Sequence, residues 1–121
     1  MEKMLYDIEI YQNFFCVGIK NYNTKEIIFY EISEEKDDRK AIYDFFMTFT
    51  GFLISFNGIH YDNMIIKYYL KNYEDYEYLH WINITSDLKW FSNKIIDSTN
   101  DNEVNKIKYL KTGWIDIDLF L

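Results

Sequence analysis

The stretch Met4-Leu5-Tyr6-Asp7-Ile8-Glu9-Ile10-Tyr11 decides the fold of this chain. Its side chains alternate, so that Tyr6, Ile8 and Ile10 point to one face of a β-strand while Asp7 and Glu9 point to the other. Two neighbouring acids repel each other and are costly to bury without a partner. A divalent cation between them removes that cost, and hard cations such as Mg²⁺ prefer carboxylate oxygens. The stretch therefore predicts a strand with one apolar face and a candidate metal-binding pair.

An exposed strand edge is the alternative interpretation of this pair, because the Asp-x-Glu spacing is not specific by itself. The chain has 20 acidic residues, and two further pairs share the spacing, Asp75 with Glu77 and Asp101 with Glu103. These two fall on a predicted helix end and a predicted polar loop, where a spacing of two does not bring side chains together. We expect both to face solvent.

The next segments predict an antiparallel meander. Apolar, β-rich runs cover Phe14 to Ile19 and Glu26 to Ile32, and the connections between the three strands are short and polar. A helix is expected from Ser33 to about Phe49, because a capping side chain is followed by acids and then by apolar residues at helical spacing. The short apolar run from Phe52 to Phe56 predicts a central, buried strand.

The remaining segments complete an α/β pattern within one domain spanning residues 1–121. Tyr61 to Asn72 is predicted as a second helix. A third helix is expected to begin at Thr85 or Ser86, which act as its cap. A polar loop (97–105) and a last short strand (114–119) follow. The order is β-β-β-α-β-α-α-β, which predicts a mixed sheet in which a three-stranded meander precedes a parallel strand.

A second polar feature lies between the short central strand and the second helix. Asn57 follows the strand directly and Asp62 begins the helix. In α/β sheets, the crevice beyond the carboxyl end of a strand is where ligands bind. Simple helix capping by Asp62 and turn chemistry at Asn57-Gly58 remain as alternatives.

These two features together resemble a known family. Leu5-Tyr6-Asp7-Ile8-Glu9-Ile10 and Ser55-Phe56-Asn57-Gly58-Ile59-His60-Tyr61-Asp62-Asn63 resemble the first and second exonuclease motifs of the DnaQ-like (DEDD, ribonuclease H-like) 3′–5′ exonucleases of the phage type. The resemblance implies a ribonuclease H-like mixed sheet.

The resemblance also implies a mechanism and a set of site residues. Asp7, Glu9 and Asp62 would be catalytic ligands of Mg²⁺ or Mn²⁺ in a two-metal hydrolysis of the terminal phosphodiester. Asn57, Phe56 and Tyr61 would bind the substrate, which would be single-stranded or 3′-terminal nucleic acid.

The third motif of that family, a helix with His or Tyr followed by Asp, is not among the 121 residues. We therefore expect a truncated, partial exonuclease domain that is slow or inactive alone. The alternative is a catalytically inactive relative that acts as a protein-binding module or inhibitor. In either case we expect a protein partner or a homodimer, because the edges of a half-sheet are open to pairing.

Composition and charge limit the partners and the cellular compartment that we expect for this chain. The net charge is −7, so the chain lacks the basic surface that holds nucleic acid by counterion release. A nuclease whose cations hold the phosphate remains open, as does a protein that never touches nucleic acid. The single cysteine, Cys16, is expected in the core and favours a reducing compartment. No secretory signal or membrane span is visible, so we expect the cytoplasm of a bacterial or phage-infected host cell and no membrane partner.

Overall fold

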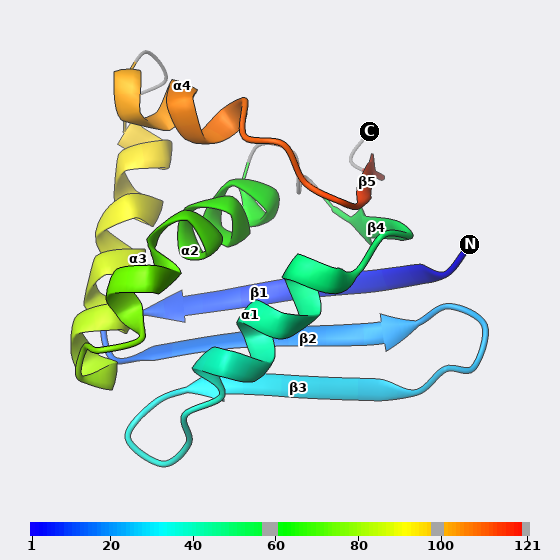
Figure 1. Ribbon diagram of the computed structural model, residues 1–121, viewed down its shortest axis with the longest axis horizontal. Coiled ribbons are helices and arrows are strands. Elements are labelled where there is room, and N and C mark those ends of the chain that lie inside the picture. Colours follow the sequence, from blue (N-terminus) through cyan, green and yellow to red (C-terminus); the bar gives the residue numbers. More distant parts are fainter. Residues whose placement is uncertain (57–60, 98–100, 120–121) are drawn as a thin grey trace.

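A computed structural model describes residues 1–56, 61–97 and 101–119 of the protein (Figure 1). It has a five-stranded mixed sheet and four helices in this part of the chain. The elements follow the order β1 (Lys3–Tyr11), β2 (Phe14–Asn21), β3 (Ile27–Ile32), α1 (Arg39–Thr48), β4 (Phe52–Ser55), α2 (Asp62–Tyr76), α3 (Trp81–Asp97), α4 (Asn102–Lys108) and β5 (Ile115–Asp118).

The strands lie in the order β3-β2-β1-β4-β5. The pairs β1–β2 and β2–β3 are antiparallel, which confirms the predicted meander. The pairs β1–β4 and β4–β5 are parallel, and β4 lies between two neighbours, as its apolar sequence predicted. The predicted mixed α/β sheet is thus confirmed at the level of class and strand pairing.

One face of the sheet, called the inner face here, packs against helices. Its buried residues include Tyr6, Ile8, Ile10, Phe15, Val17, Ile19 and Leu53. The ring of Tyr6 contacts Phe46 of α1, with centroids 6.1 Å apart, and the ring of Phe15 stacks on Tyr69 of α2 at 6.2 Å. Figure 1 shows α1 crossing over β2 and β3 on this side. The alternation predicted for β1 is confirmed, and the opposite side is called the outer face.

Helix α1 begins at Arg39, so the predicted start at Ser33 is wrong. The Ser33 hydroxyl accepts the backbone N–H of Glu35 at 3.1 Å, and the Ser33 N–H donates to the carbonyl of Lys36 at 2.7 Å. These bonds close a tight loop after β3. Serine satisfies the backbone of a turn as readily as that of a helix end, and here it serves the turn.

Helices α2 and α3 also depart from their predicted bounds. Helix α2 continues to Tyr76 rather than ending at Asn72. Helix α3 begins at Trp81, because His80 Nδ1 accepts the N–H of Ile82 at 3.2 Å. The expected cap, Thr85, lies inside the helix.

The Thr85 hydroxyl donates to the carbonyl of Gln12 at 3.0 Å. It therefore ties α3 to the turn between β1 and β2 rather than capping a helix. Leu88 and Phe91 of α3 are fully buried and fix the helix to the core.

The predicted polar loop after α3 contains a helix, α4, and that part of the prediction is wrong. Asp101 caps it by accepting the N–H groups of Glu103 at 2.8 Å and Val104 at 3.3 Å. Lys94 bridges Asp101 at 3.3 Å and Glu103 at 3.2 Å. This Asp-x-Glu pair therefore has a local structural role.

Cys16 is half-buried on the outer face, opposite Glu9, so the expectation of a core position is wrong. The period of two on β2 buries Phe15 and Val17 instead. None of the helices in the described ranges is long and apolar enough to cross a membrane.

Candidate functional site

The site is built on the outer face of β1. Asp7 and Glu9 are both exposed there, with Asp7 opposite Gly18 and Glu9 opposite Cys16 on β2. The two acids share a face because strand residues two apart point the same way.

Asp62 reaches the same region from the helix side. Strand β4 pairs only with the first part of β1, from Lys3 to Leu5, and ends at Ser55. Past that point the N-terminus of α2 meets β1, and the carboxylate of Asp62 accepts the backbone N–H of Ile8. Asp62 is only 6% exposed. A buried aspartate thus serves a backbone group of β1 that β4 is too short to reach.

The carboxyl groups of Asp62 and Asp7 are coupled. Burial, the charge of Asp7 and a hydrogen bond between the two side chains raise the pKa of Asp62 to about 7, while the N–H of Ile8 opposes this rise. Asp118, at the end of β5, raises it further. The pair therefore holds a proton near neutral pH, or accepts a cation in its place.

A neighbouring network holds Asp116 on β5. Trp114 Nε1 donates to its carboxylate at 2.7 Å, and the side chain of Asn63 donates to it as well. Burial raises the pKa of Asp116, whereas these bonds and the charge of Lys67 lower it. The Asn63 Oδ1 atom is buried and has no hydrogen-bond partner among the described residues. An oxygen that lacks a donor suits a cation or an ordered water.

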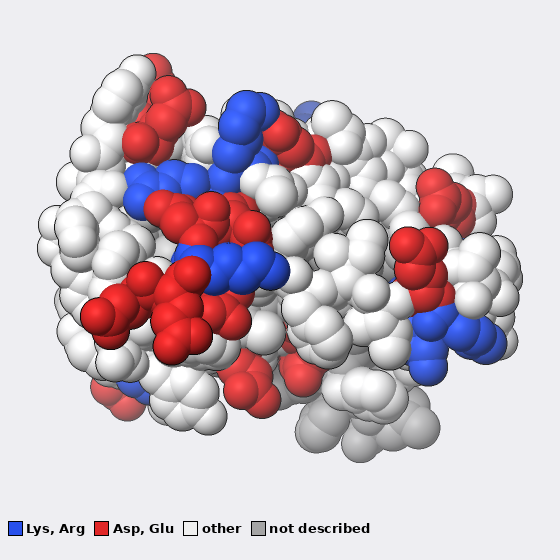
Figure 2. All heavy atoms as spheres, turned by 90° about the horizontal axis from the view of Figure 1, so that it is seen from below, with Lys and Arg blue, Asp and Glu red and all other residues white. Residues whose placement is uncertain are grey.

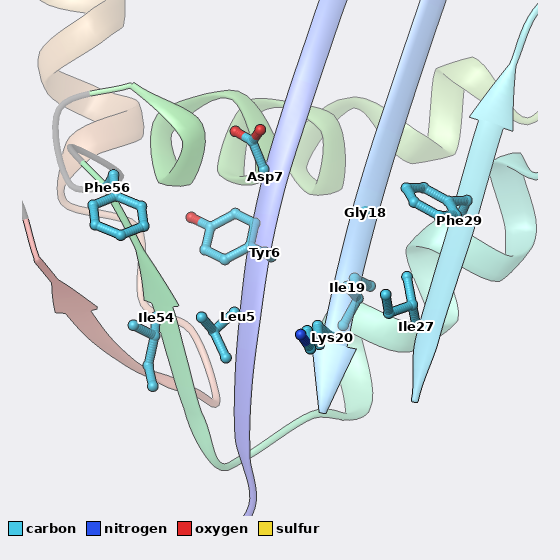
Figure 3. A pocket seen from close by; sticks show the side chains of 10 residues that line it. All are labelled: Leu5, Tyr6, Asp7, Gly18, Ile19, Lys20, Ile27, Phe29, Ile54 and Phe56. Atoms are coloured by element: carbon cyan, nitrogen blue, oxygen red, sulfur yellow. The ribbon is translucent and has the colours of Figure 1, made fainter. Parts of the chain in front are cut away.

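A shallow hollow of about 440 Å³ adjoins Asp7 on the outer face. It is lined by Leu5, Tyr6, Asp7, Gly18, Ile19, Lys20, Ile27, Phe29, Ile54 and Phe56. Figure 3 shows Phe56 and Phe29 at its opposite sides. Apart from Asp7 and Lys20 the lining side chains are mainly apolar, and Phe56 is 71% exposed.

The predicted site residues are only partly brought together. Asp7 and Asp62 are coupled, and Phe56 lines the hollow beside Asp7. Glu9 lies opposite Cys16 and raises the pKa of its thiol, after the larger effect of burial. The Tyr61 hydroxyl is hydrogen-bonded to Ser92 of α3 at 2.6 Å.

Another predicted site residue, Asn57, lies outside the described residues. The sequence analysis assigned no role in the site to Asn63 or Asp118. Only the pairing of β5 with β4 brings Asp118 toward Asp62. No local signal in the sequence gives that pairing.

The donor chemistry suits a hard cation such as Mg²⁺ or Mn²⁺, because the groups gathered here are carboxylate and amide oxygens. Within residues 1–56, 61–97 and 101–119, however, no three His, Cys, Asp or Glu side chains are grouped so that they could hold a metal ion. The geometry thus provides the Asp7–Asp62 pair and not a complete set of protein ligands.

Comparison with protein-family models, with curated proteins and with solved structures gives no match.

Proposed function

We propose that this chain is a metal-dependent 3′–5′ exonuclease domain of the DnaQ-like class, acting on the 3′ end of single-stranded nucleic acid. The observation that carries the proposal is the coupling of Asp62, at the start of α2, to Asp7 on β1. These are the positions at which the two resembling motifs place their aspartates. A chance match of two short motifs does not require their acids to meet in space.

The arrangement of the sheet supports the same proposal. An antiparallel meander followed by a helix and a parallel strand beside β1 is how a ribonuclease H-like sheet is laid down. Here β4 follows α1 and pairs in parallel with β1. The acids lie where β4 ends, which is where α/β sheets bind ligands.

In this proposal Asp7 and Asp62 hold Mg²⁺ or Mn²⁺, and Glu9 contributes from the next outer-face position of β1. A bound divalent cation would activate water and neutralise charge on the scissile phosphate. The chain's own groups position the substrate. Phe56 offers an exposed ring for a base to stack on, and Asn57 keeps its predicted substrate-binding role.

A non-catalytic binding role is the second candidate. The observation that favours it is the lack of a three-ligand metal group in the described parts of the chain. An inactive relative would keep the sheet and use its surface for a protein partner.

A cleavage assay separates the two candidates. A single-stranded DNA and a matching RNA, each labelled so that loss of the 3′ nucleotide is seen, are incubated with Mg²⁺ or Mn²⁺. The exonuclease proposal predicts stepwise shortening from the 3′ end that is lost with Asp7→Asn and kept with the exposed control Asp75→Asn. If a folded wild-type chain shortens neither strand, and neither Mg²⁺ nor Mn²⁺ at millimolar concentration changes its melting temperature, the exonuclease proposal is wrong.

A further inference from the structure

A second hollow, of about 210 Å³, lies among the helices and not on the outer face of the sheet. It is formed by α1, by α2 and by the segment between α4 and β5. Its lining residues are Met47, Lys67, Leu70, Lys71, Leu110, Lys111 and Thr112. Three of them are lysines and none is acidic. We call Lys67, Lys71 and Lys111 the lysine triad.

No acidic side chain in the described part of the chain forms an ion pair with the lysine triad. Acids are nevertheless in excess, since the net charge is −7, and cations elsewhere do find them. Figure 2 views the molecule from below Figure 1, and on that face the basic side chains lie against acidic ones. Lys36, Arg39 and Lys40 each pair with an aspartate in this way. The charge of the triad is therefore left unbalanced.

Lys67 shows most clearly that an anion is missing. It is only 9% exposed, and lysine is rarely buried without a charged partner. Its Nζ donates to the carbonyl of Lys108 at the end of α4, at 2.9 Å. That bond caps α4, but an ammonium group has three N–H donors. Burial lowers the pKa of Lys67, and the charge of Asp116 opposes this only in part.

We propose that this hollow binds a phosphate group, which the ammonium groups of Lys67, Lys71 and Lys111 hold. Lys67 and Lys71 are four residues apart on α2 and so share one face of that helix. Lys111 adds a third positive charge from the segment that follows α4. A phosphate group accepts through several oxygens and carries more charge than a carboxylate, so it satisfies three cations better.

The size of the hollow limits what enters it. Sites that enclose a whole small molecule measure about 300–1,000 Å³, and this one is smaller at about 210 Å³. It takes a phosphate group and leaves the rest of a larger ligand outside. The same chemistry is offered by a free phosphate ion and by a phosphodiester of a nucleic-acid strand. The experiment below separates these two sources.

The phosphate site goes beyond the proposed exonuclease function and does not rest on it. None of the lysine triad belongs to the candidate metal site. Asp7 lies on the outer face of β1, whereas α1 and α2 pack on the inner face. Measuring phosphate binding with EDTA present keeps a failure of this site distinct from a failure of the metal site.

The test is a calorimetric titration of sodium phosphate into the whole chain in EDTA, with sodium chloride of equal ionic strength as the comparison. The expected result is saturable binding in the millimolar range. Lys67→Met should raise the dissociation constant at least about tenfold. The exposed Lys71→Gln and Lys111→Gln should each raise it about threefold.

The control is Lys106→Gln, which removes the same charge from an exposed position on α4 that does not line the hollow. It should bind phosphate as wild type does. Circular dichroism melting shows whether each variant is folded. The two exposed variants keep the test decisive even where Lys67→Met does not fold.

A competition experiment identifies the source of the phosphate. A short single-stranded oligodeoxythymidylate is added before the phosphate titration. Loss of phosphate binding assigns the site to a nucleic-acid strand, and unchanged phosphate binding assigns it to a free ion; both results support the site. A folded wild type that shows no saturable phosphate binding would overturn the proposal. Binding that Lys71→Gln and Lys111→Gln leave equal to that of wild type would overturn it as well.

Discussion

Replacing Asp62 with asparagine should stabilise the protein at alkaline pH. A carboxyl whose pKa is about 7 in the folded chain, against an ordinary value of 3.8, costs about 4 kcal/mol to ionise on folding. Because Asp62 is nearly fully buried, solvent screens little of this cost. Asparagine keeps an oxygen for the N–H of Ile8 and carries no charge.

The direction of the pH dependence follows from the number of protons bound in the folded and unfolded states. Between pH 3.8 and about 7 the folded chain keeps the Asp62 proton while the unfolded chain releases it. The contribution of Asp62 to the free energy of unfolding therefore falls as pH rises through this window and is constant above it. Asp62→Asn removes that fall. The free energy of unfolding of the variant, relative to that of wild type, should therefore rise by up to about 4 kcal/mol as the pH is raised from about 4 to about 8.

The assay is urea denaturation followed by circular dichroism, at about pH 4.5 and about pH 8.5 in EDTA. The quantity compared is the variant-minus-wild-type difference at each pH, which cancels the titration of the other carboxyls. Asp75→Asn, at an exposed position, is the control and should show no pH-dependent difference. If Asp62→Asn is equally destabilising at both pH values, the raised pKa of Asp62 is refuted.

Three further changes test the packing, each by urea denaturation. Arg39→Ala should lower the free energy of unfolding by about 2 kcal/mol or more, because the guanidinium donates to the carbonyls of Tyr76 and Leu79, at 2.7 and 2.6 Å. The control Lys40→Ala, at an exposed position, should lower it far less. Equal losses for the two variants would contradict this role of Arg39. Gly51→Ala should be severely destabilising, because its Cβ would collide with the backbone oxygen of Glu2. Gly18→Ala should cost under about 1 kcal/mol, since its Cβ meets only an exposed aromatic ring at 3.0 Å, and the reverse order would be evidence against these contacts.

The strands were predictable because their signals are local. In β1 the alternation of Tyr6, Ile8 and Ile10 sets the buried face without reference to any other segment. The helix starts were less predictable. Ser33 and Asp101 are both capping residues, but one closes a turn and the other begins a helix. In both cases a side-chain oxygen accepts the backbone N–H two residues further on. Only the path of the backbone after that residue distinguishes the turn from the helix.

The candidate site also has a part that the local sequence predicts and a part that depends on contacts between distant segments. That Asp7 and Glu9 share a face follows from the strand period alone. That Asp62 approaches Asp7 depends on β4 ending at Ser55 and on the N-terminus of α2 taking its place beside β1. Two further features depend on β5 pairing with β4, a contact between distant segments that no local pattern encodes. They are the Asn63 oxygen, which lacks a partner among the described residues, and the influence of Asp118 on Asp62.

The measurement that tests the central claim most directly is a calorimetric titration of Mg²⁺ and Mn²⁺ into the wild-type chain, Asp7→Asn and the control Asp75→Asn. The account predicts that wild type and control bind a divalent cation and release protons near neutral pH, and that Asp7→Asn loses this binding. No heat and no change in melting temperature with millimolar metal, or equal binding by Asp7→Asn, would contradict a metal site at the Asp7–Asp62 pair.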